Sequence, residues 1–580
     1  MRFPLRKKDF IIMLGLATLS LLLNFRGITV GLPSLERQKL SVGGPDAVEK
    51  ALPEVHKVLN SNLGERSEFL DKTDKKQFAP LAKISPYLDQ IRSFHPDEQF
   101  TLKALASMAK RKSPKPESYI YSPFFYYQIG AALLAGRITG FIPSESSVDY
   151  FLVHPDRFRP IYLCGRILCA IYGMLAVLAV YLTARRLTAR HGQAFFAAAL
   201  VACLPLVVLS AKFIKPEMPT LFWTALALYF SIGILQRGNW KDYLLAGICV
   251  GLAGGTKYPA VFSCLYVLFY HAARRRYGFQ LKSPFSRSDL KLIEAGAAAA
   301  GAFFLLNPTI LLDLSRFLGD LQWIKSVARD GNWLFNIADS FMLYCYDAFF
   351  YTMGYAAFIA MLAGVVYSCV KPRPTYLAML PVIFIFIWLA AQGLFAEAYM
   401  IPAYVPLSLL AARAVYAIPK KSVRHAGVTI ILVMTFGWSW AWLDSATHEN
   451  ARITAVRWIN ENIPAGAKIA TERYPVSYRV PMVNPKRYKT VIQDIDGEAA
   501  AANSDYYINT SFQWLNVPFY DRYAGVVDEK TPFDNFEKLK TIEYVPRVFG
   551  VIPLKRRCRV THFMEVVAPV INIYARKKQD

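Results

Sequence analysis

Two acidic residues follow a histidine–proline pair early in the chain, in the order His95-Pro96-Asp97-Glu98. A positioned carboxylate can remove a proton from a hydroxyl group, so this pair is a candidate for general base catalysis. The same residues also fit an ordinary helix start, because proline suits the first helical position and acidic side chains suit the first turn. The sequence leaves both interpretations open.

A third acid and a lysine lie beside apolar runs further along the chain. Glu217 stands in the short segment 215–219, with the sequence Lys-Pro-Glu-Met-Pro, between two apolar runs. Lys257 follows Gly251-Leu-Ala-Gly-Gly255, whose GxxxG spacing permits close contact between helices. Ionisable groups at a membrane boundary are costly, which makes both residues functional candidates. The alternatives are a helix start for Glu217 and a lysine side chain that reaches the membrane interface for Lys257.

Other polar residues near the ends of apolar runs are weaker candidates. Arg166 lies a few residues inside such a run, where a charge needs a partner. Further residues of this kind are Tyr121-Ser122-Pro123, Tyr258, Asn307-Pro308 and Glu397-Ala398-Tyr399. Each of these alone is typical of packing or of interface anchoring. Asp494-Ile495-Asp496 spells a DxD pattern, but the following Asp496-Gly497 step is typical of a turn, which is our interpretation.

The sequence predicts no metal site and no required cofactor. It contains no CxxC or HExxH spacing, and its eight histidines are scattered. The paired acids at 97 and 98 leave a divalent cation as an open alternative, although no further ligand pattern accompanies them.

The composition is that of an integral membrane protein. Apolar residues make up 54% of the 580 residues and charged residues only 19%, below the roughly 25% of soluble proteins. The net charge of +25 comes largely from short loops between apolar runs, such as Arg185-Arg186, Arg274–Arg276 and Lys420-Lys421. This is the positive-inside pattern of membrane proteins and argues against a nucleic-acid partner.

Run length and loop charge predict about eleven membrane spans. The first, Phe10–Phe25, is interpreted as an uncleaved span with a cytoplasmic N-terminus. The apolar run Tyr119–Ile142 is interpreted as a juxtamembrane or re-entrant helix, because a full span there would place the basic loops outside. The remaining spans are predicted at 161–183, 193–211, 219–236, 243–257, 258–272, 292–313, 342–369, 376–394, 399–418 and 425–443.

The chain is expected to divide into two domains. Residues 1–443 form a transmembrane catalytic module whose first external loop covers 26–160, and residues 444–580 form a small external α/β domain. Within the first loop, Ala47–Asn60 and Pro80–Arg92 are predicted to be helical. In the tail we predict a helix at Ala451–Asn462 and strands within Tyr488–Ile492, Tyr506–Ile508 and Val566–Tyr574.

Taken together and in order, these motifs resemble the GT-C class of membrane glycosyltransferases, in particular the clan of protein O-mannosyltransferases and the lipid A aminoarabinose transferase. The matching pieces are His95–Glu98, Tyr121–Tyr127, Gly165–Ile167, Ala184–Leu187, Lys215–Pro219, Asp242–Gly247, Gly251–Pro259, Ala455–Ile459 and Ile463–Gly466. They extend over most of the chain. The resemblance implies a GT-C-like helical fold with an external C-terminal α/β domain.

The resemblance also implies roles for individual residues. Asp97, with Glu98 beside it, corresponds to the catalytic carboxylate, and Glu217 corresponds to a second acidic position that is usually aspartate. Lys257, with Tyr258 and Arg166, corresponds to the group that holds the donor phosphate. His95, Tyr121, Glu397 and Tyr399 are expected to line the substrate cavity. Ala398 stands where an arginine often precedes the tyrosine in the clan.

The predicted function is an inverting transfer of a sugar from a polyprenyl-phosphate donor to a hydroxyl acceptor, which is a glycolipid, a glycan or a protein. The expected location is a bacterial inner membrane, with the active site and the tail on the periplasmic side and membrane lipids as partners. We expect the carboxyl group of Asp97 and the ammonium group of Lys257 to border a common pocket that opens to the exterior. The alternatives are a flippase or transporter for lipid-linked glycans, and an O-antigen ligase or polymerase. A transporter would favour inverted repeats and polar helices at the midplane, which this sequence lacks.

Overall fold

The computed structural model describes residues 6–60, 79–145, 147–277, 287–329, 352–390, 397–471, 477–511, 534–554 and 562–577. Residues 342–351 of the span predicted at 342–369 lie outside these ranges. The chain forms two compact units, which are described separately below. The first unit consists of Met1–Ile28, Phe100–Ala132 and Gly165–Leu443, and the second of Thr29–Gln99, Leu133–Cys164 and Asp444–Asp580. The division into domains at residue 443 stays a prediction.

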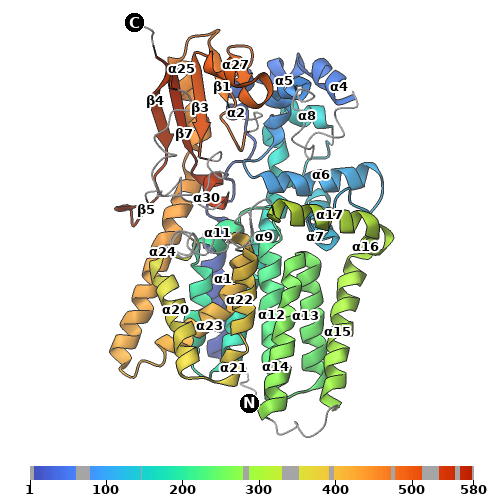
Figure 1. The fold of residues 1–580 in the computed structure, drawn as a ribbon, viewed down its shortest axis with the longest axis vertical. Helices are drawn as coiled ribbons and strands as arrows, with labels where there is room; N and C mark the ends of the chain where they lie inside the picture. Colours follow the sequence, from blue (N-terminus) through green and yellow to red (C-terminus); the bar gives the residue numbers. More distant parts are fainter. Residues whose placement is uncertain are drawn as a thin grey trace. The chain divides into compact units, whose positions relative to one another are not determined.

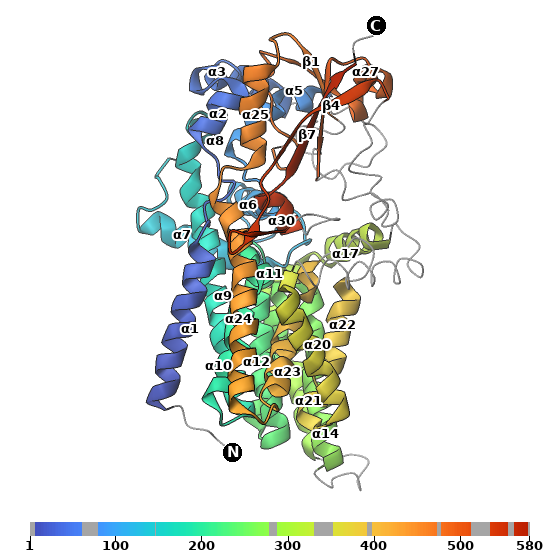
Figure 2. The ribbon, with the colours of Figure 1, turned by 90° about the vertical axis from the view of Figure 1, so that its left-hand side faces the viewer.

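The first unit is a helical bundle (Figures 1 and 2). Its main helices are α1 (Lys7–Phe25), α9 (Arg159–Leu187), α10 (His191–Ala202), α11 (Pro205–Ser210), α12 (Glu217–Gln236), α13 (Trp240–Thr256), α14 (Cys264–Tyr277), α15 (Arg287–Leu306), α20 (Tyr355–Val370), α22 (Leu380–Ala390), α23 (Tyr404–Val415) and α24 (Lys421–Thr447). Shorter elements connect them: η4 (Tyr258–Ser263), α16 (Pro308–Leu312), α17 (Leu314–Arg329), α21 (Pro374–Leu377) and η7 (Glu397–Ala403). Helix α6 (Pro96–Lys110) begins in the second unit and ends in the first, whereas α7 (Pro123–Ile138) begins in the first and ends in the second.

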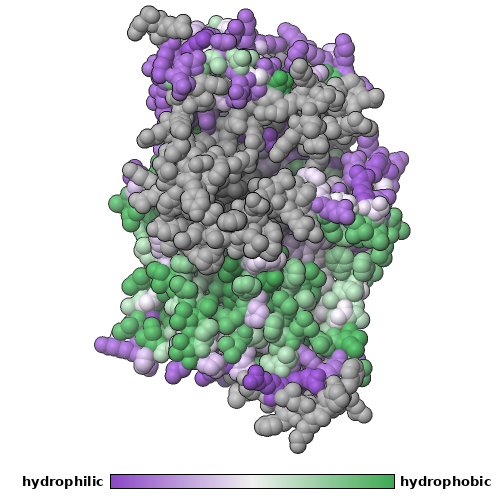
Figure 3. Space-filling view, viewed as in Figure 1, coloured by the Kyte–Doolittle hydropathy of each residue, from purple (hydrophilic) through white to green (hydrophobic). Residues whose placement is uncertain are grey.

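The bundle carries the apolar surface that a bilayer requires. Within the described residues, five helical segments are long and apolar enough to cross a membrane: Lys7–Phe25, Pro155–Leu187, Glu217–Gln236, Glu397–Val415 and Lys421–Asn462. Large apolar side chains point outward from several helices, for example Leu14 of α1 at 71% exposure and Ile359 of α20 at 62%. Figure 3 shows hydrophobic residues gathered over the bundle, with hydrophilic residues at its lower end. The protein is therefore a mostly helical integral membrane protein.

Prolines break several runs that the sequence predicted to be continuous spans. The run 193–211 is divided into α10 and α11 at Pro205, and the run 292–313 is divided into α15 and α16 at Pro308. The run 258–272 begins as the 3₁₀ helix η4, with Pro259 in its first turn, before α14 starts. Proline lacks a backbone N–H and clashes with the preceding turn, which explains these interruptions. Helix α7 has 16 residues, or about 24 Å, and is not among the candidate spans.

Glycines on one face of α13 bring this helix very close to α15. A Cβ atom at Gly247 or Gly251 would overlap the backbone carbonyl oxygen of Ala295 or Ala299, respectively. At Gly255, one helical turn further on, a Cβ would come within 2.9 Å of the Asn307 side chain. The close helix contact that the GxxxG spacing predicted is confirmed. Helices α12, α13 and α15 lie side by side in this part of the bundle (Figure 1).

The second unit begins with short helices from the first loop. They are α2 (Leu35–Val42), α3 (Pro45–Glu49), α4 (Leu52–Asn60), α5 (Ala79–Leu88), η2 (Asp89–Ile91), α8 (Val148–Val153) and η3 (Pro155–Phe158). Buried apolar residues such as Val48, Val55 and Ile84 form a core between them. The helices predicted within 47–60 and 80–92 are confirmed, although the first region is divided into α3 and α4.

A five-stranded mixed sheet from the tail completes the second unit. Its strands are β1 (Lys468–Thr471), β2 (Lys489–Ile492), β3 (Tyr506–Thr510), β4 (Phe536–Glu543) and β7 (Val570–Arg576), in the order β2-β1-β3-β7-β4. β1 is parallel to β2 and β3, whereas β7 is antiparallel to β3 and β4. Helix α25 (Ala451–Asn462) packs on the sheet through Ala455 and Ile459. The predicted small α/β fold of the tail is confirmed.

One detail of the tail differs from the prediction, and another agrees with it. Residues 566–567, predicted to be extended, belong to helix α30 (His562–Val567), and the strand starts at Val570. The DxD segment forms α26 (Gln493–Asp496), a single helical turn that ends at Gly497 with a φ of 93°. Glycine adopts a positive φ without steric strain, so the segment forms a turn that ends at Gly497. In this turn the Asp496 carboxylate accepts the backbone N–H of Ile492 at 2.7 Å. α27 (Glu498–Ala502) follows, and β5 (Arg547–Val548) pairs with β6 (Ile552–Pro553) in a separate hairpin.

Candidate functional site

In the first unit, Lys257 and Glu217 form a buried ion pair. Lys257 is the first residue after α13, where the backbone becomes extended before η4 begins. Its Nζ donates to Glu217 Oε1 at 3.1 Å, although the two residues are 40 positions apart. Glu217 is the first residue of α12, and its side chain is only 2% exposed. Two residues that the sequence proposed separately therefore meet.

A second lysine and an aromatic ring complete this cluster. Lys215 Nζ lies 3.5 Å from the same Glu217 oxygen. The Tyr399 ring, from η7, faces Lys257 with 4.4 Å between Nζ and the ring centroid, which is cation–π geometry. Two ammonium groups thus lie beside one carboxylate. Ammonium groups can bind an anionic ligand.

The other carboxylate oxygen of Glu217 is available for a further contact. Oε2 is buried and accepts no hydrogen bond from the residues that the structure describes. Buried polar atoms are normally paired, so an unpaired carboxylate oxygen calls for a donor from outside the described chain. A hydroxyl group of a bound sugar is a donor of the right kind.

Backbone contacts fix the end of α13 that carries Lys257. The Ser122 hydroxyl donates to the backbone carbonyl of Gly255 and also lies 2.6 Å from Asn307 Oδ1. Asn307 Oδ1 accepts the backbone N–H of Phe124 at 2.8 Å, and its amide donates to Phe303 O. The candidate segments 121–123 and 307–308 are thus brought together two residues before Lys257. Tyr121 belongs to this junction and packs edge-on against Phe125.

Tyr258 is directed into a group of aromatic residues. Its ring packs edge-on against Phe317 with the centroids 5.4 Å apart, and Tyr119 packs on the same Phe317 ring. The Tyr258 hydroxyl is buried and has no hydrogen-bond partner among the described residues. Glu397, at the start of η7, is buried two residues before Tyr399.

Arg166 makes a different set of contacts from Lys257. It is fully buried on α9, its guanidinium donates to the Ile28 carbonyl at 2.6 Å, and it lies over the Phe213 ring. Lys212 is also fully buried and donates to the carbonyls of Leu23 and Asn24 at the end of α1. Burial and the nearby arginines hold the pKa of Lys212 well below its usual range. These cations stabilise the end of a helix, where a positive charge is favourable.

In the second unit, the acidic pair lies at the start of α6, and its two members differ. His95 Nδ1 accepts the backbone N–H of Asp97 at 3.2 Å and so caps the helix. Glu98 is fully buried, and its Oε2 accepts the Ser93 hydroxyl at 2.6 Å. Asp97 is half-buried. The helix start that the sequence suggested is confirmed, and Asp97 is the more accessible acid.

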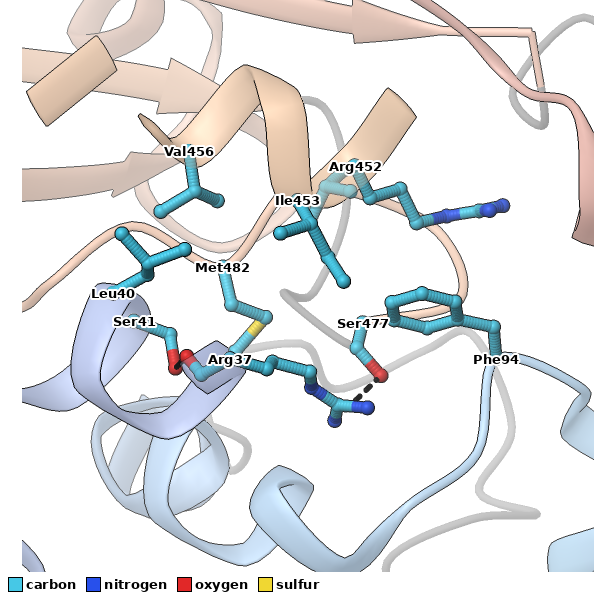
Figure 4. A pocket seen from close by; sticks show the side chains of 10 residues that line it. Arg37, Leu40, Ser41, Phe94, Arg452, Ile453, Val456, Ser477 and Met482 are labelled. Carbon is cyan, nitrogen blue, oxygen red and sulfur yellow. Dashed lines mark hydrogen bonds between the residues drawn. The ribbon is translucent and has the colours of Figure 1, made fainter. Parts of the chain in front are cut away.

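Two arginines hold the residue that precedes this turn. The Phe94 ring lies 5.0 Å from the Arg37 guanidinium and 5.3 Å from that of Arg452, measured to the ring centroid. Figure 4 shows these side chains around a small cavity, with the bond from Arg37 to Ser477 dashed. The Asp89 carboxylate accepts from Arg37 and from the Ser477 backbone, each at 3.1 Å. Burial lowers the pKa of Arg37, and Asp89 opposes this effect.

The structure therefore groups the predicted site residues into two sets. Glu217, Lys257 and Tyr399 lie together in the first unit, whereas His95, Asp97 and Glu98 lie together in the second. The expected joint action of Asp97 and Lys257 stays a prediction.

Sequence reasoning did not propose Lys215 as a site residue, although its place two positions before Glu217 was a usable signal. It also did not foresee the arginines around Phe94, which come from distant segments. Among the described residues, no three possible metal ligands of the His, Cys, Asp or Glu type gather in one place.

The apolar bundle is that of a membrane protein. The cationic cluster at the end of α13 is suited to bind an anionic ligand. A family model for dolichyl-phosphate-mannose-protein mannosyltransferases matches residues 157–306, about a quarter of the chain. This match confirms the predicted resemblance and the predicted class, a membrane glycosyltransferase, on the strength of that segment. The segment contains Arg166, Lys215, Glu217, Lys257 and Tyr258. No curated protein sequence matches the chain.

Solved structures show more distant similarities. The oligosaccharyltransferase AglB from Archaeoglobus fulgidus, in complex with an inhibitory peptide and a dolichol-phosphate, is 14% identical with a TM-score of 0.42, over 89% of this chain and 72% of that one. ArnT from Cupriavidus metallidurans, bound to undecaprenyl phosphate, is 12% identical with a TM-score of 0.40, over 86% and 97%. The S. cerevisiae protein O-mannosyltransferase Pmt1–Pmt2 complex is 15% identical with a TM-score of 0.30, over 57% and 35%. These TM-scores are too low to assign the fold.

Proposed function

We propose that this protein is an inverting glycosyltransferase that moves a sugar from a polyprenyl-phosphate donor to a hydroxyl acceptor. The observation that carries the proposal is the buried pair of Lys257 and Glu217 with Lys215 beside it. This cluster lies inside the segment that matches mannosyltransferases, whose donor is a sugar on a lipid phosphate. Its two ammonium groups suit that phosphate. Lys257, with Tyr258 near it, is proposed to hold the phosphate, and Arg166 to support the positive field.

The proposed reaction is a single displacement at the anomeric carbon. Asp97 takes the proton from the acceptor hydroxyl, and the oxygen forms a bond to the anomeric carbon while the bond to the phosphate oxygen breaks. The lipid phosphate leaves with the electron pair, and Lys257 stabilises the charge that develops on it. A general base contributes about 10²–10⁴ in rate, and an electrostatic stabiliser about 3–4 kcal/mol.

Asp97 is proposed as the base in preference to Glu98. Its half-buried side chain at the start of α6 can meet an acceptor, whereas Glu98 is fully buried against Ser93. Glu98 is proposed to shape the turn, and Glu217 to orient a donor hydroxyl through Oε2. His95, Tyr121, Glu397 and Tyr399 are proposed as residues of the substrate cavity.

The finer features of the sequence prediction belong to the same proposal. These are a GT-C-like arrangement of about eleven spans, a cytoplasmic N-terminus, and an active site and tail on the periplasmic side of a bacterial inner membrane. The basic loops at Arg185-Arg186 and Lys420-Lys421 support this orientation. The acceptor is proposed to be a glycolipid, a glycan or a protein that carries a free hydroxyl group.

The test uses the purified full-length protein with polyprenyl-phosphate sugars and candidate acceptors, and it measures the release of sugar from the lipid. Asp97→Asn should abolish detectable transfer, because an amide cannot accept the proton, and should leave thermal unfolding in detergent unchanged. Glu98→Gln is the matched control, since the amide oxygen can still accept from Ser93, and it should keep most of the activity. Normal turnover of the Asp97→Asn variant would remove the proposed base.

A further inference from the structure

The hairpin of β5 and β6 exposes an unusual apolar tip. Phe549, Val551 and Ile552 are 49%, 72% and 52% exposed. Phe549 has a φ of 53° and Gly550 a φ of 73°, so both central residues of the turn are left-handed. Such a turn favours Asn-Gly, and a bulky aromatic residue at its first position is sterically costly. The chain therefore keeps an exposed aromatic side chain where a small polar residue would fit better.

The hairpin is firmly built despite its short strands. Gly550 N donates to Arg547 O at 3.2 Å, and Val551 N donates to Val548 O at 3.1 Å. Below the turn, Leu554 N donates to Pro546 O at 2.8 Å. Val548 and Leu554 are buried, so the base of the hairpin packs against the protein while its tip points away.

The segment that leads into the hairpin is attached to the end of the last candidate span. The Tyr544 hydroxyl donates to the Asp444 carboxylate near the C-terminal end of α24. The Tyr544 ring also stacks on His448, with the centroids 4.4 Å apart and the planes 28° from parallel. Burial, with the Asp444 acceptor, raises the pKa of Tyr544 to about 12, so the hydroxyl keeps its proton at neutral pH.

Asp444 is the first residue after the span that the sequence predicts at 425–443. From His425 to Asp444 the helix rises about 29 Å at 1.5 Å per residue, which equals the thickness of the hydrocarbon core. Trp440, which is 37% exposed, lies about one helical turn before Asp444. Tryptophan and tyrosine are enriched at the membrane–water interface. The bond to Asp444 thus holds Tyr544 at the level of the interface. Phe549 is five residues further along the chain, and an extended chain of that length spans at most about 18 Å.

We propose that the tip Phe549–Ile552 inserts into the lipid headgroup region on the side where α24 ends, and so anchors the tail to the membrane surface. Lipid is the binding partner that the observations favour. The apolar tip follows Tyr544, which is held at the level of the interface, and the exposed Arg547 can bind lipid phosphates. This inference is independent of the transfer reaction. It requires only that α24 crosses the bilayer.

The test places a photoreactive benzophenone amino acid at position 549 of the full-length protein in nanodiscs of phosphatidylethanolamine and phosphatidylglycerol. Position 539 is the matched control, because Leu539 on β4 is 48% exposed but lies on a strand, away from the hairpin. After irradiation, mass spectrometry should find at least about tenfold more lipid adduct at position 549 than at position 539, because only the tip reaches the apolar layer.

A second variant tests the apolar character of the tip. Val551→Asp with Ile552→Asp should lower the lipid adduct at position 549 about tenfold, because carboxylates are costly below the headgroups. Equal labelling at positions 539 and 549, or adducts at 549 that consist of protein instead of lipid, would overturn the proposal. The second outcome would identify a copy of this chain, or another of its segments, as the occupant.

Discussion

Two buried glutamates, one in each unit, are held by different kinds of partner. Glu217 Oε1 lies between the ammonium groups of Lys257 and Lys215. Glu98 accepts the neutral hydroxyl of Ser93. Removal of the charge at position 217 would break the ion pair with Lys257, whereas the same change at position 98 would alter the hydrogen bond from Ser93. In the first unit a charge thus holds its partner, and in the second a hydroxyl helps to shape the turn that carries Asp97.

The largest effect is expected for Lys257→Met, which tests the electrostatic role of the ion pair in the first unit. Methionine keeps the length of the side chain and removes its charge, so the transfer rate should fall about 10²–10³-fold if Lys257 neutralises the departing phosphate. Steady-state release of sugar from the lipid donor measures this effect. Lys215→Met is the matched control, because the direct bond between Glu217 and Lys257 survives, and its loss should be smaller. Equal losses in the two variants would contradict a special role for Lys257.

The stability of the same cluster gives the second test. Glu217→Gln should destabilise the protein by about 3–5 kcal/mol, because loss of one partner of a buried ion pair leaves unpaired charge. Thermal unfolding in a fixed detergent measures the change. The double variant Glu217→Gln with Lys257→Met should be more stable than the sum of the single effects predicts, with a coupling of about 0.5–3 kcal/mol. Strict additivity would show that the pair does not interact.

The smallest expected effect concerns the turn in the second unit. Ser93→Ala removes the hydroxyl that donates to the Glu98 carboxylate, and a hydrogen bond to a charged group contributes about 1.5–3 kcal/mol. The midpoint of thermal unfolding should fall accordingly, and transfer should be reduced less than in Lys257→Met. The addition of Glu98→Gln should restore part of the stability, since a neutral amide is less costly to bury than a carboxylate. A loss of stability larger than that of Glu217→Gln would reverse the comparison.

Local patterns in the sequence predicted much of the fold. The helix at Ala451–Asn462 was predicted with its observed bounds, because Pro464 and Gly466 end the pattern. The GxxxG spacing identified the contact of α13. The strands β1 and β4 were not predicted, and β4 shows why: its burial pattern is exposed at five consecutive positions and so lacks alternation. Run length also merged helices that Pro205 and Pro308 separate.

The candidate site was predictable only as a set of separate residues. The types of Glu217 and Lys257 and their places at the ends of apolar runs identified them as candidates. Their pairing depends on the packing of α12 against α13 and η4, which no local pattern encodes. The contacts of Phe94 are also not encoded by any local pattern. The two arginines beside its ring come from α2 and α25, which are more than 400 positions apart in the 580-residue chain.

Three of the four glycines of α13, Gly247, Gly251 and Gly255, have a mechanical consequence. Because no side chain separates α13 from α15 at Gly247 and Gly251, the two helices are restricted from sliding past one another. At the opposite end of the pair, Lys291 of α15 donates to the Gly238 carbonyl just before α13 at 2.9 Å. A ligand that moves the backbone at Lys257 would therefore shift both helices together, and with them the loop at Gly238, about 25 Å away along the helix axis.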